Sequence, residues 1–279
     1  MGTLGSGNHY LEIQKVVEIF DPEKAKQLGI LQKDQITIMI HCGSRGFGHQ
    51  IASDYLYQFG QAMKKYQLTI PDRQLACAPI NSPEGKAYFA AMACAVNYAF
   101  CNRQLLTHKV RQVFGQVFGQ KPEKLGLNLV YDVAHNVAKW ENDLLVHRKG
   151  ATRAFGPNNP ALPQEYQPLG QPVIIGGSME TASYLLLGTK KAEELTFAST
   201  CHGAGRVMSR AQAKRQVHGK NLQKQLQQKG IYIRPASYAG LAEEAGLAYK
   251  NIDLVIEAVA EAGISLPIAK FKPIGNIKG

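Results

Sequence analysis

The sequence predicts an α+β fold, with mixed or antiparallel β-sheets in a sandwich-like core flanked by helices. The first observation is composition: 45% of the 279 residues are apolar, which is enough to bury a substantial core. The second is order, because the expected strands and helices do not alternate strictly, as they would in a doubly wound parallel sheet. The length suits one large domain, so we expect residues 1–279 to form a single domain.

The first half of the chain is predicted to hold one buried strand and two helices. Residues 36–40, Ile-Thr-Ile-Met-Ile, are a continuous apolar run typical of a buried strand. Glycines follow, and an amphipathic pattern then predicts a helix from about Gln50 to Tyr66. A longer helical pattern runs from about Pro83 to Phe114, and its small residues allow close packing.

The second half is predicted to be richer in strands. Short apolar runs bounded by turn residues favour strands, and the proline-rich run at 156–163 favours a connecting loop. We predict strands at residues 127–133, 144–147, 172–175 and 183–187, shorter strands at 231–234 and near 268–271, and helices at 207–216, 220–229 and 252–262.

The charge of the chain points to an acidic partner. The formal net charge is +11 and the isoelectric point is near 9.4, which favours nucleic acid first and a membrane surface only second. No apolar stretch is long enough to cross a bilayer, since residues 87–100 are interrupted by Asn97. Five cysteines without CxxC spacing, and no secretory signal, predict free thiols in a soluble, cytoplasmic protein.

The most informative segment is Ser199–Arg206, which places a thiol and the imidazole of His202 on a glycine-rich turn. Exposed backbone N–H groups, a following helix and the charges of Arg206 and Arg210 all attract phosphate. His202 can then act as a general acid or base, a metal ligand or a nucleophile, and a capped loop histidine is the alternative. Cys201 and the similarly placed Cys42 are reactive thiolates, soft ligands or small buried residues.

Three further histidines occur in glycine-rich or strand-terminal contexts. His9 follows three glycines, His41 ends the strand at 36–40, and His135 ends the expected strand at 127–133. One such histidine is usually structural, but four favour a convergent site whose imidazoles select Mn, Fe, Co, Ni or Zn over Mg or Ca. No Walker or Rossmann motif occurs, so phosphates must be held in another way.

Two other turns suit polyanions. Residues 146–153 carry three cations around a glycine, and residues 176–183 supply hydroxyls and backbone N–H groups. A solvated charged face is the ordinary reading of such runs, but these cations lie on turns between apolar strands, where they project from one edge. We interpret them as contacts to RNA or phosphate.

Taken together, the motifs resemble the RtcB family of GTP- and manganese-dependent RNA ligases, which join an RNA 3′-phosphate or 2′,3′-cyclic phosphate to a 5′-hydroxyl. The resemblance covers Gly2 to Gly279. It rests on the segments Gly2–His9, His41–Gln50, Ala87–Ala95, Tyr131–Asn136, Val146–Phe155, Ser199–Arg206, Ala248–Lys250 and Ile277–Gly279.

The resemblance implies a role for each matching residue. His202 is the nucleophile that becomes guanylyl-histidine, while His9, His41 and His135 bind manganese, of which the family holds two ions. RNA-side cations correspond to Arg45, Lys149 and Arg210. The guanylate site corresponds to Asn8, His9, Tyr10, Glu12, His135, Asn136, Gly176, Gly177, Ser178, Met179, Ser183, His202, Gly203, Ala204, Gly205, Tyr249 and Lys278.

Two departures from the family pattern affect this expectation. The family's N-terminal region, with an Asp-x-x-Cys metal pair, is not represented, which predicts a fragment or a truncated homologue. The turn reads Gly176-Gly-Ser-Met-Glu180, where the family usually has proline first and glycine last, and Glu180 would repel a phosphate beside it. A catalytically impaired protein that binds RNA ends, or a phosphoesterase that only opens cyclic phosphates, therefore stays open, as does an activating protein partner.

Overall fold

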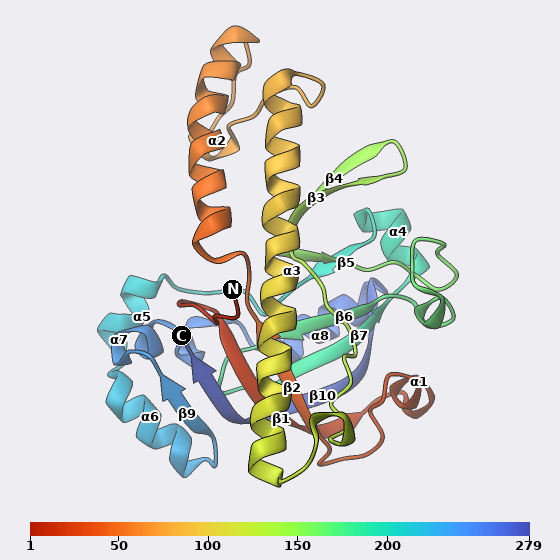
Figure 1. Cartoon of the computed structure of the whole chain (residues 1–279), viewed down its shortest axis with the longest axis vertical. Coiled ribbons are helices and arrows are strands. Elements are labelled where there is room, and N and C mark those ends of the chain that lie inside the picture. The colour runs from red at the N-terminus through yellow and green to blue at the C-terminus, as the bar shows by residue number, and fades with distance from the viewer. The chain divides into compact units, whose positions relative to one another are not determined.

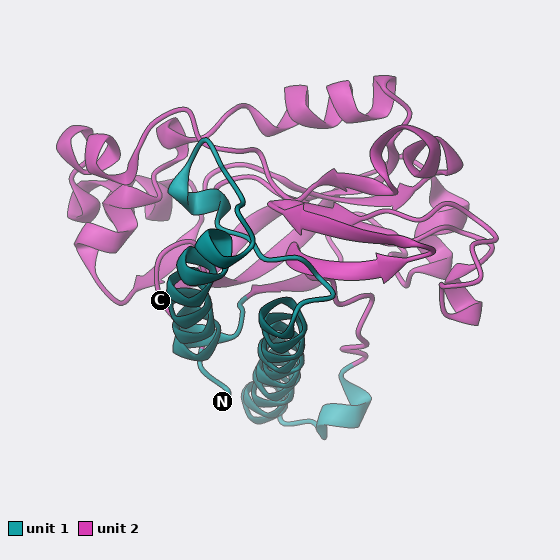
Figure 2. Ribbon diagram, turned by 90° about the horizontal axis from the view of Figure 1, so that it is seen from above, with its two compact units in different colours: residues 1–3, 42–125 teal, residues 4–41, 126–279 magenta.

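The computed structural model describes residues 1–279. By contacts between backbone segments, the chain divides into two compact units, shown in different colours in Figure 2. Unit 1 consists of residues 1–3 and 42–125, and unit 2 of residues 4–41 and 126–279. Whether the whole chain folds as one domain stays a prediction, and each unit is described separately.

Unit 2 is built on a six-stranded sheet with the order β2-β1-β10-β7-β6, in which β9 also pairs with β10 (Figure 1). Only the β9–β10 pair is parallel, so the sheet is mixed and the expected α+β class is confirmed. The strands are β1 (Tyr10–Ile19), β2 (Ile36–His41), β6 (Pro172–Gly176), β7 (Ser183–Gly188), β9 (Tyr232–Pro235) and β10 (Ser265–Lys278).

Two smaller sheets complete the β-structure of unit 2. Strands β3 (Asn136–Glu141) and β4 (Leu144–Lys149) form an antiparallel hairpin, seen as a separate ribbon in Figure 1. Strand β5 (Ala151–Arg153) continues the chain after β4 and pairs with β8 (Ser199–Cys201). His202 directly follows β8, so the pairing of β5 with β8 helps to fix its position.

Helices cover the sheet of unit 2, and apolar side chains fill both of its faces. Leu185 and Leu187 of β7 join one buried cluster, while Tyr184 and Leu186 join another that includes Ile252. Strand side chains alternate between faces, so β7 is buried on both. The helices are α1 (Pro22–Gln27), α4 (Lys190–Thr196), α5 (Arg210–Gln216), α6 (Gly219–Gln228), α7 (Tyr238–Glu243) and α8 (Ile252–Glu261), with 3-10 turns at Gln164–Tyr166 and Gly246–Ala248.

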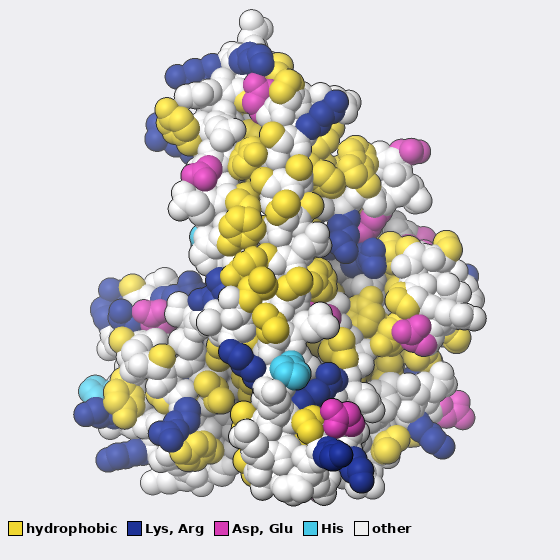
Figure 3. Space-filling view, viewed as in Figure 1, with side chains coloured by type: hydrophobic (Ala, Val, Ile, Leu, Met, Phe, Trp, Pro, Cys, Tyr) yellow, Lys and Arg dark blue, Asp and Glu magenta, His cyan; other side chains and the backbone are white.

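Unit 1 consists mainly of two helices, α2 (Arg45–Lys65) and α3 (Pro83–Phe118), with 3-10 turns at Arg73–Leu75 and Pro122–Lys124. Helix α3 begins where the Ser82 hydroxyl accepts a hydrogen bond from a backbone N–H of the first turn, and it ends at Gly119, which has φ +62°. Figure 3 shows hydrophobic side chains exposed along these helices, and basic side chains scattered over the face drawn.

Most of the predicted elements are confirmed, with boundaries shifted by a few residues, but the strand predicted as short near residues 268–271 is the 14-residue strand β10. The predicted strand at 127–133 is wrong, because this segment pairs with no other strand: the Val130 carbonyl instead accepts a hydrogen bond from the Tyr166 hydroxyl at 2.5 Å. The helix predicted from residue 207 begins only at Arg210, behind a capping box formed by Ser209 and Gln212. The five cysteines are free, as expected, and no helix is long and apolar enough to cross a membrane.

Candidate functional site

Three neighbouring strands of the main sheet place predicted site residues side by side. Tyr10 of β1 lies opposite His41 of β2 on one side and opposite Lys278 of β10 on the other. The centroids of the Tyr10 and His41 rings are 5.4 Å apart, and the Lys278 ammonium lies 5.3 Å from the centroid of the Tyr10 ring. Burial raises the pKa of the Tyr10 hydroxyl well above its ordinary value.

The four histidines singled out in the sequence converge around His41. The centroid of its ring lies 5.6 Å from that of His9, 5.1 Å from that of His135 and 6.4 Å from that of His202. The rings of His135 and His202 are stacked, with centroids 4.2 Å apart. His41 ends a strand, as predicted, whereas His135 precedes β3 and does not end a strand. Residues remote in the sequence thus form one imidazole cluster.

Two ring nitrogens of the cluster lie close together. The Nε2 atoms of His41 and His135 are 2.9 Å apart, the distance of a hydrogen bond in which one of the two carries the proton, and this is shorter than the roughly 3.3 Å between two imidazole nitrogens bound to one tetrahedral ion. Burial, and then the neighbouring His135, lower the pKa of His41 to about 3, so His41 is in the neutral form that binds metals. Once that proton is lost, the two facing nitrogens can both serve as ligands, although no group of three or more His, Cys, Asp or Glu side chains has the arrangement of a metal site.

His202 is held in one tautomer by the end of the β3–β4 hairpin. Its Nδ1 atom lies 2.7 Å from the carbonyl oxygen of Gly150, and because a carbonyl can only accept, Nδ1 carries the proton. Nε2 therefore keeps its lone pair. Gly150 has φ +65°, which favours glycine, and its N–H donates to the His135 carbonyl at 2.8 Å and to Asn136 Oδ1 at 3.1 Å.

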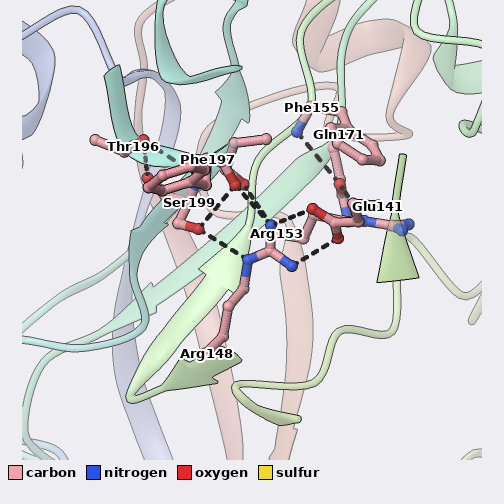
Figure 4. Close-up of polar contacts among 9 residues, drawn as sticks. Glu141, Arg148, Arg153, Phe155, Gln171, Thr196, Phe197 and Ser199 are labelled. Atoms are coloured by element: carbon pink, nitrogen blue, oxygen red, sulfur yellow. Dashed lines mark hydrogen bonds and ion pairs between the residues drawn. The ribbon is translucent and has the colours of Figure 1, made fainter. Parts of the chain in front are cut away.

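A buried ion pair braces the same region (Figure 4). Arg148 of β4 makes two hydrogen bonds of 2.7 Å to the carboxylate of Glu141, donates to the Ser199 hydroxyl at 2.8 Å, and donates to the carbonyl of Phe197 at 2.7 Å. The guanidinium thereby joins the hairpin to β8, the strand that immediately precedes His202. Arg148 is only 4% exposed, so these contacts are shielded from water.

Backbone hydrogen bonds join the glycine-rich turns at 176–180 and 203–205. The N–H of Gly176 donates to the carbonyl of His202 at 3.3 Å, and the N–H of Ala204 donates to the carbonyl of Gly176 at 2.9 Å. Glu180 accepts a hydrogen bond from the N–H of Gly246 at 2.6 Å, so its carboxylate has a partner in the protein. The side chain of Met179 is buried in an apolar cluster, which leaves only its backbone for binding.

A buried carboxylate that sequence reasoning missed organises the cations of the site. Glu244, 1% exposed, accepts a hydrogen bond from Arg210 at 3.0 Å and one from the Tyr249 hydroxyl. Arg206 lies 3.4 Å from it and Lys278 lies 4.0 Å from it. Glu244 follows another glutamate in an ordinary helical sequence, so nothing in the pattern distinguishes it from a surface residue.

The other predicted residues occupy different kinds of position. Asn8 lies in the turn before β1, Ser183 is buried at the start of β7, and Lys149 is exposed at the end of β4. Arg45 belongs to unit 1, where it is the first residue of α2 and has φ +57°.

Glu12 is a carboxyl group in an almost fully buried position. Its two oxygens accept hydrogen bonds from Gln14 at 2.7 Å and from Asn276 at 2.6 Å. Burial raises the pKa of Glu12 to about 7, although these bonds and the nearby Lys278 act in the opposite direction. Asn276 Oδ1 is buried without a hydrogen-bond partner, so a protonated Glu12 has an acceptor close by after rotation of the amide.

We expect the raised pKa of Glu12 to destabilise the protein as pH rises. An unfolded glutamate titrates near 4.5, so between pH 4.5 and about 7 the folded state binds more protons and stability falls through this range. The shift corresponds to about 3 kcal/mol. Urea unfolding of the free chain from pH 5 to pH 8 should show this loss, and Glu12→Gln, which does not titrate, should remove it. Equal pH dependence of the two proteins would contradict the assignment.

Comparison with known proteins gives the family. The model of the family described as tRNA-splicing ligase RtcB matches residues 1–279. Proteins named tRNA-splicing ligase RtcB from Archaeoglobus fulgidus, Methanococcus maripaludis and Pyrococcus abyssi are 55%, 54% and 53% identical to this chain over its whole length. The chain spans 59%, 60% and 31% of those three proteins. Since the family match runs from the first residue to the last, the chain belongs to the RtcB family.

Proposed function

We propose that this chain carries the catalytic centre of a GTP- and manganese-dependent RNA ligase, which joins a 3′-phosphate or 2′,3′-cyclic phosphate end to a 5′-hydroxyl end. The observation that carries the proposal is the state of His202: Nδ1 is fixed on the Gly150 carbonyl, so Nε2 keeps its lone pair in a ring that lies beside those of His135 and His41. The family name of its relatives supports RNA as the substrate.

In the proposed reaction, Nε2 of His202 attacks the α-phosphorus of GTP. A P–N bond forms, the bond from that phosphorus to the bridging oxygen breaks, and pyrophosphate leaves. A 2′,3′-cyclic phosphate is first opened by water, which breaks the bond to the 2′-oxygen and leaves a 3′-phosphate. An oxygen of the RNA 3′-phosphate then displaces His202 and takes the GMP. Finally the 5′-hydroxyl attacks the activated RNA phosphorus, loses its proton, and releases GMP. The Gly150 carbonyl stabilises the charge that His202 gains in the first step.

His9, His41 and His135 are the proposed manganese ligands. The 2.9 Å spacing of the His41 and His135 nitrogens supports two of them, and imidazole suits manganese among other transition metals. Bound metal supplies positive charge that stabilises the phosphoryl transition states. The neutral state of His41 leaves a lone pair for coordination.

Buried polar groups at the ends of β1 and β10 are suited to guanine. The carboxyl of Glu12 and the unpartnered Oδ1 of Asn276 can accept from the N–H groups of the base, and Lys278 can donate to its carbonyl. Arg206 and Arg210, held by Glu244, are the proposed partners of phosphate, and Lys149 and Arg45 are the other proposed RNA contacts. The five free cysteines are compatible with a cytoplasmic location.

The test is covalent labelling. Incubation of the chain with GTP labelled at the α-phosphate and with manganese should give a protein adduct that is acid-labile and base-stable, as a phosphoramidate is. Labelled ATP should give none. Absence of any adduct with GTP and saturating manganese would refute the proposed function for this chain.

A second function has one observation in its favour. Because no group of three potential ligands has the arrangement of a metal site, the chain is also compatible with a catalytically impaired protein that binds RNA ends. Titration with manganese separates the two proposals. Binding of less than one ion per chain, together with affinity for phosphate-ended RNA and no adduct, would favour the impaired protein.

A further inference from the structure

We propose that the exposed face of the β3–β4 hairpin binds single-stranded RNA and leads its 3′ end to His202. This inference deepens the proposed function and rests on it. It assigns a binding surface to residues of the hairpin, in particular Trp140 and His147, that have no part in the reaction at His202.

The strand register defines this hairpin face. Residues directly opposite each other lie on the same side of a sheet, and here the pairs are Asn136 with Lys149, Ala138 with His147, and Trp140 with Leu145. Asn136, Lys149, His147 and Trp140 are all exposed, and Trp140 keeps 51% of its surface accessible. This hairpin face therefore carries an aromatic ring, an imidazole and an ammonium group in open solvent.

The opposite side of the hairpin is bound to the protein. Val137 lies opposite Arg148, and Arg148 is buried in its contacts with Glu141 and β8 (Figure 4). The hairpin is a two-stranded sheet with no further strand beside it (Figure 1). One side thus fixes the hairpin in place, while on the other side Asn136, Trp140, His147 and Lys149 stay exposed around the buried Ala138.

The hairpin face begins at the group that positions His202. Asn136 Oδ1 accepts from the N–H of Gly150, and the carbonyl of Gly150 holds His202 Nδ1. Trp140 lies four residues after Asn136 in β3, which is roughly 13 Å from Asn136 at the usual rise of a strand. An RNA strand whose 3′-phosphate lies at His202 can follow this face past Lys149 and His147 to Trp140.

The chemistry of the hairpin face matches a single strand of RNA. An indole stacks on any base, and an ammonium attracts the backbone phosphates, so neither requires a particular sequence. The chain's net charge of +11 favours the same partner. Scattered exposed apolar residues are ordinary, but here the aromatic ring, the cation and the candidate nucleophile lie along one continuous path.

Trp140 is the only tryptophan of the chain, so it reports its own environment. We expect an octanucleotide of RNA with a 3′-phosphate to quench the intrinsic tryptophan fluorescence saturably, and a dinucleotide to quench it much less. Affinity is measured separately with RNA that carries a fluorophore at its 5′ end. Trp140→Ala should weaken binding of the octanucleotide about tenfold or more. Trp140→Phe, which keeps an aromatic ring, should restore most of the affinity.

Leu144 provides the matched control. It is 54% exposed on the same hairpin, but it lies opposite Glu141 and so belongs to the other face. Leu144→Ala should leave the affinity unchanged. RNA binding without quenching, no RNA binding at all, or equal effects of the two alanine substitutions would overturn the proposal. The GTP adduct distinguishes this proposal from the proposed function. If the adduct forms but RNA does not quench Trp140, only the role of the hairpin face is refuted.

Discussion

His202→Ala is expected to reduce the labelling of the protein by GTP to background. The substitution removes the only nucleophile in the proposed first step, and the neighbouring imidazoles of His41 and His135 cannot replace it, because they face each other at 2.9 Å. The measured quantity is the label that stays with the protein after denaturation and separation at high pH. In the unsubstituted chain, the same material should show the phosphorus attached to Nε2, since Nδ1 is committed to Gly150.

The control for this substitution is another histidine of the same unit. His218 precedes α6 and is exposed, so His218→Ala removes an imidazole without touching the cluster. It should be labelled like the unsubstituted chain. Labelling that survives in His202→Ala, or that is lost equally in His218→Ala, would show that GMP is carried by a different residue or that the loss reflects unfolding.

The histidines of the site could be selected from the sequence because each has an unusual local context. Glycines and strand ends hold side chains in fixed, exposed positions, and such contexts do not depend on knowing the fold. His41 illustrates this, since the apolar run before it predicts both the strand and its end. The distances between the rings could not be predicted from the sequence, because they depend on where the fold places β2, β3 and β8 relative to one another.

Buried polar residues explain most of what sequence patterns missed. In β1 the buried positions are Glu12, Gln14 and Val16, so the apolar residues Leu11 and Ile13 lie on the less buried side. Alternation alone would bury the wrong side of this strand. Sequence patterns missed Glu244 for the same reason. Three cations, from α5, β10 and the turn after β8, offset the cost of burying its charge.

Arg148→Met is expected to destabilise unit 2 by about 3–5 kcal/mol, because it leaves the carboxylate of Glu141 buried without its partner. The side chain of Arg148 is 1% exposed and that of Glu141 is 12% exposed, so water cannot replace the lost hydrogen bonds. Urea unfolding, followed by a signal from unit 2 such as Trp140 fluorescence, gives the free energy. Lys24→Met breaks a similarly short pair with Asp21 in the same unit, in which the lysine is 40% exposed, and it should have little effect.

The double substitution Arg148→Met with Glu141→Leu shows what kind of contribution the pair makes. Removing both charges removes the desolvation penalty, so most of the lost stability should return. The hydrogen bonds from Arg148 to Ser199 and to Phe197 are not restored, however, and these hold β8 against the hairpin. We therefore expect a stable protein with slower labelling of His202. Full stability together with unchanged labelling would mean that the pair stabilises the fold without positioning the histidine.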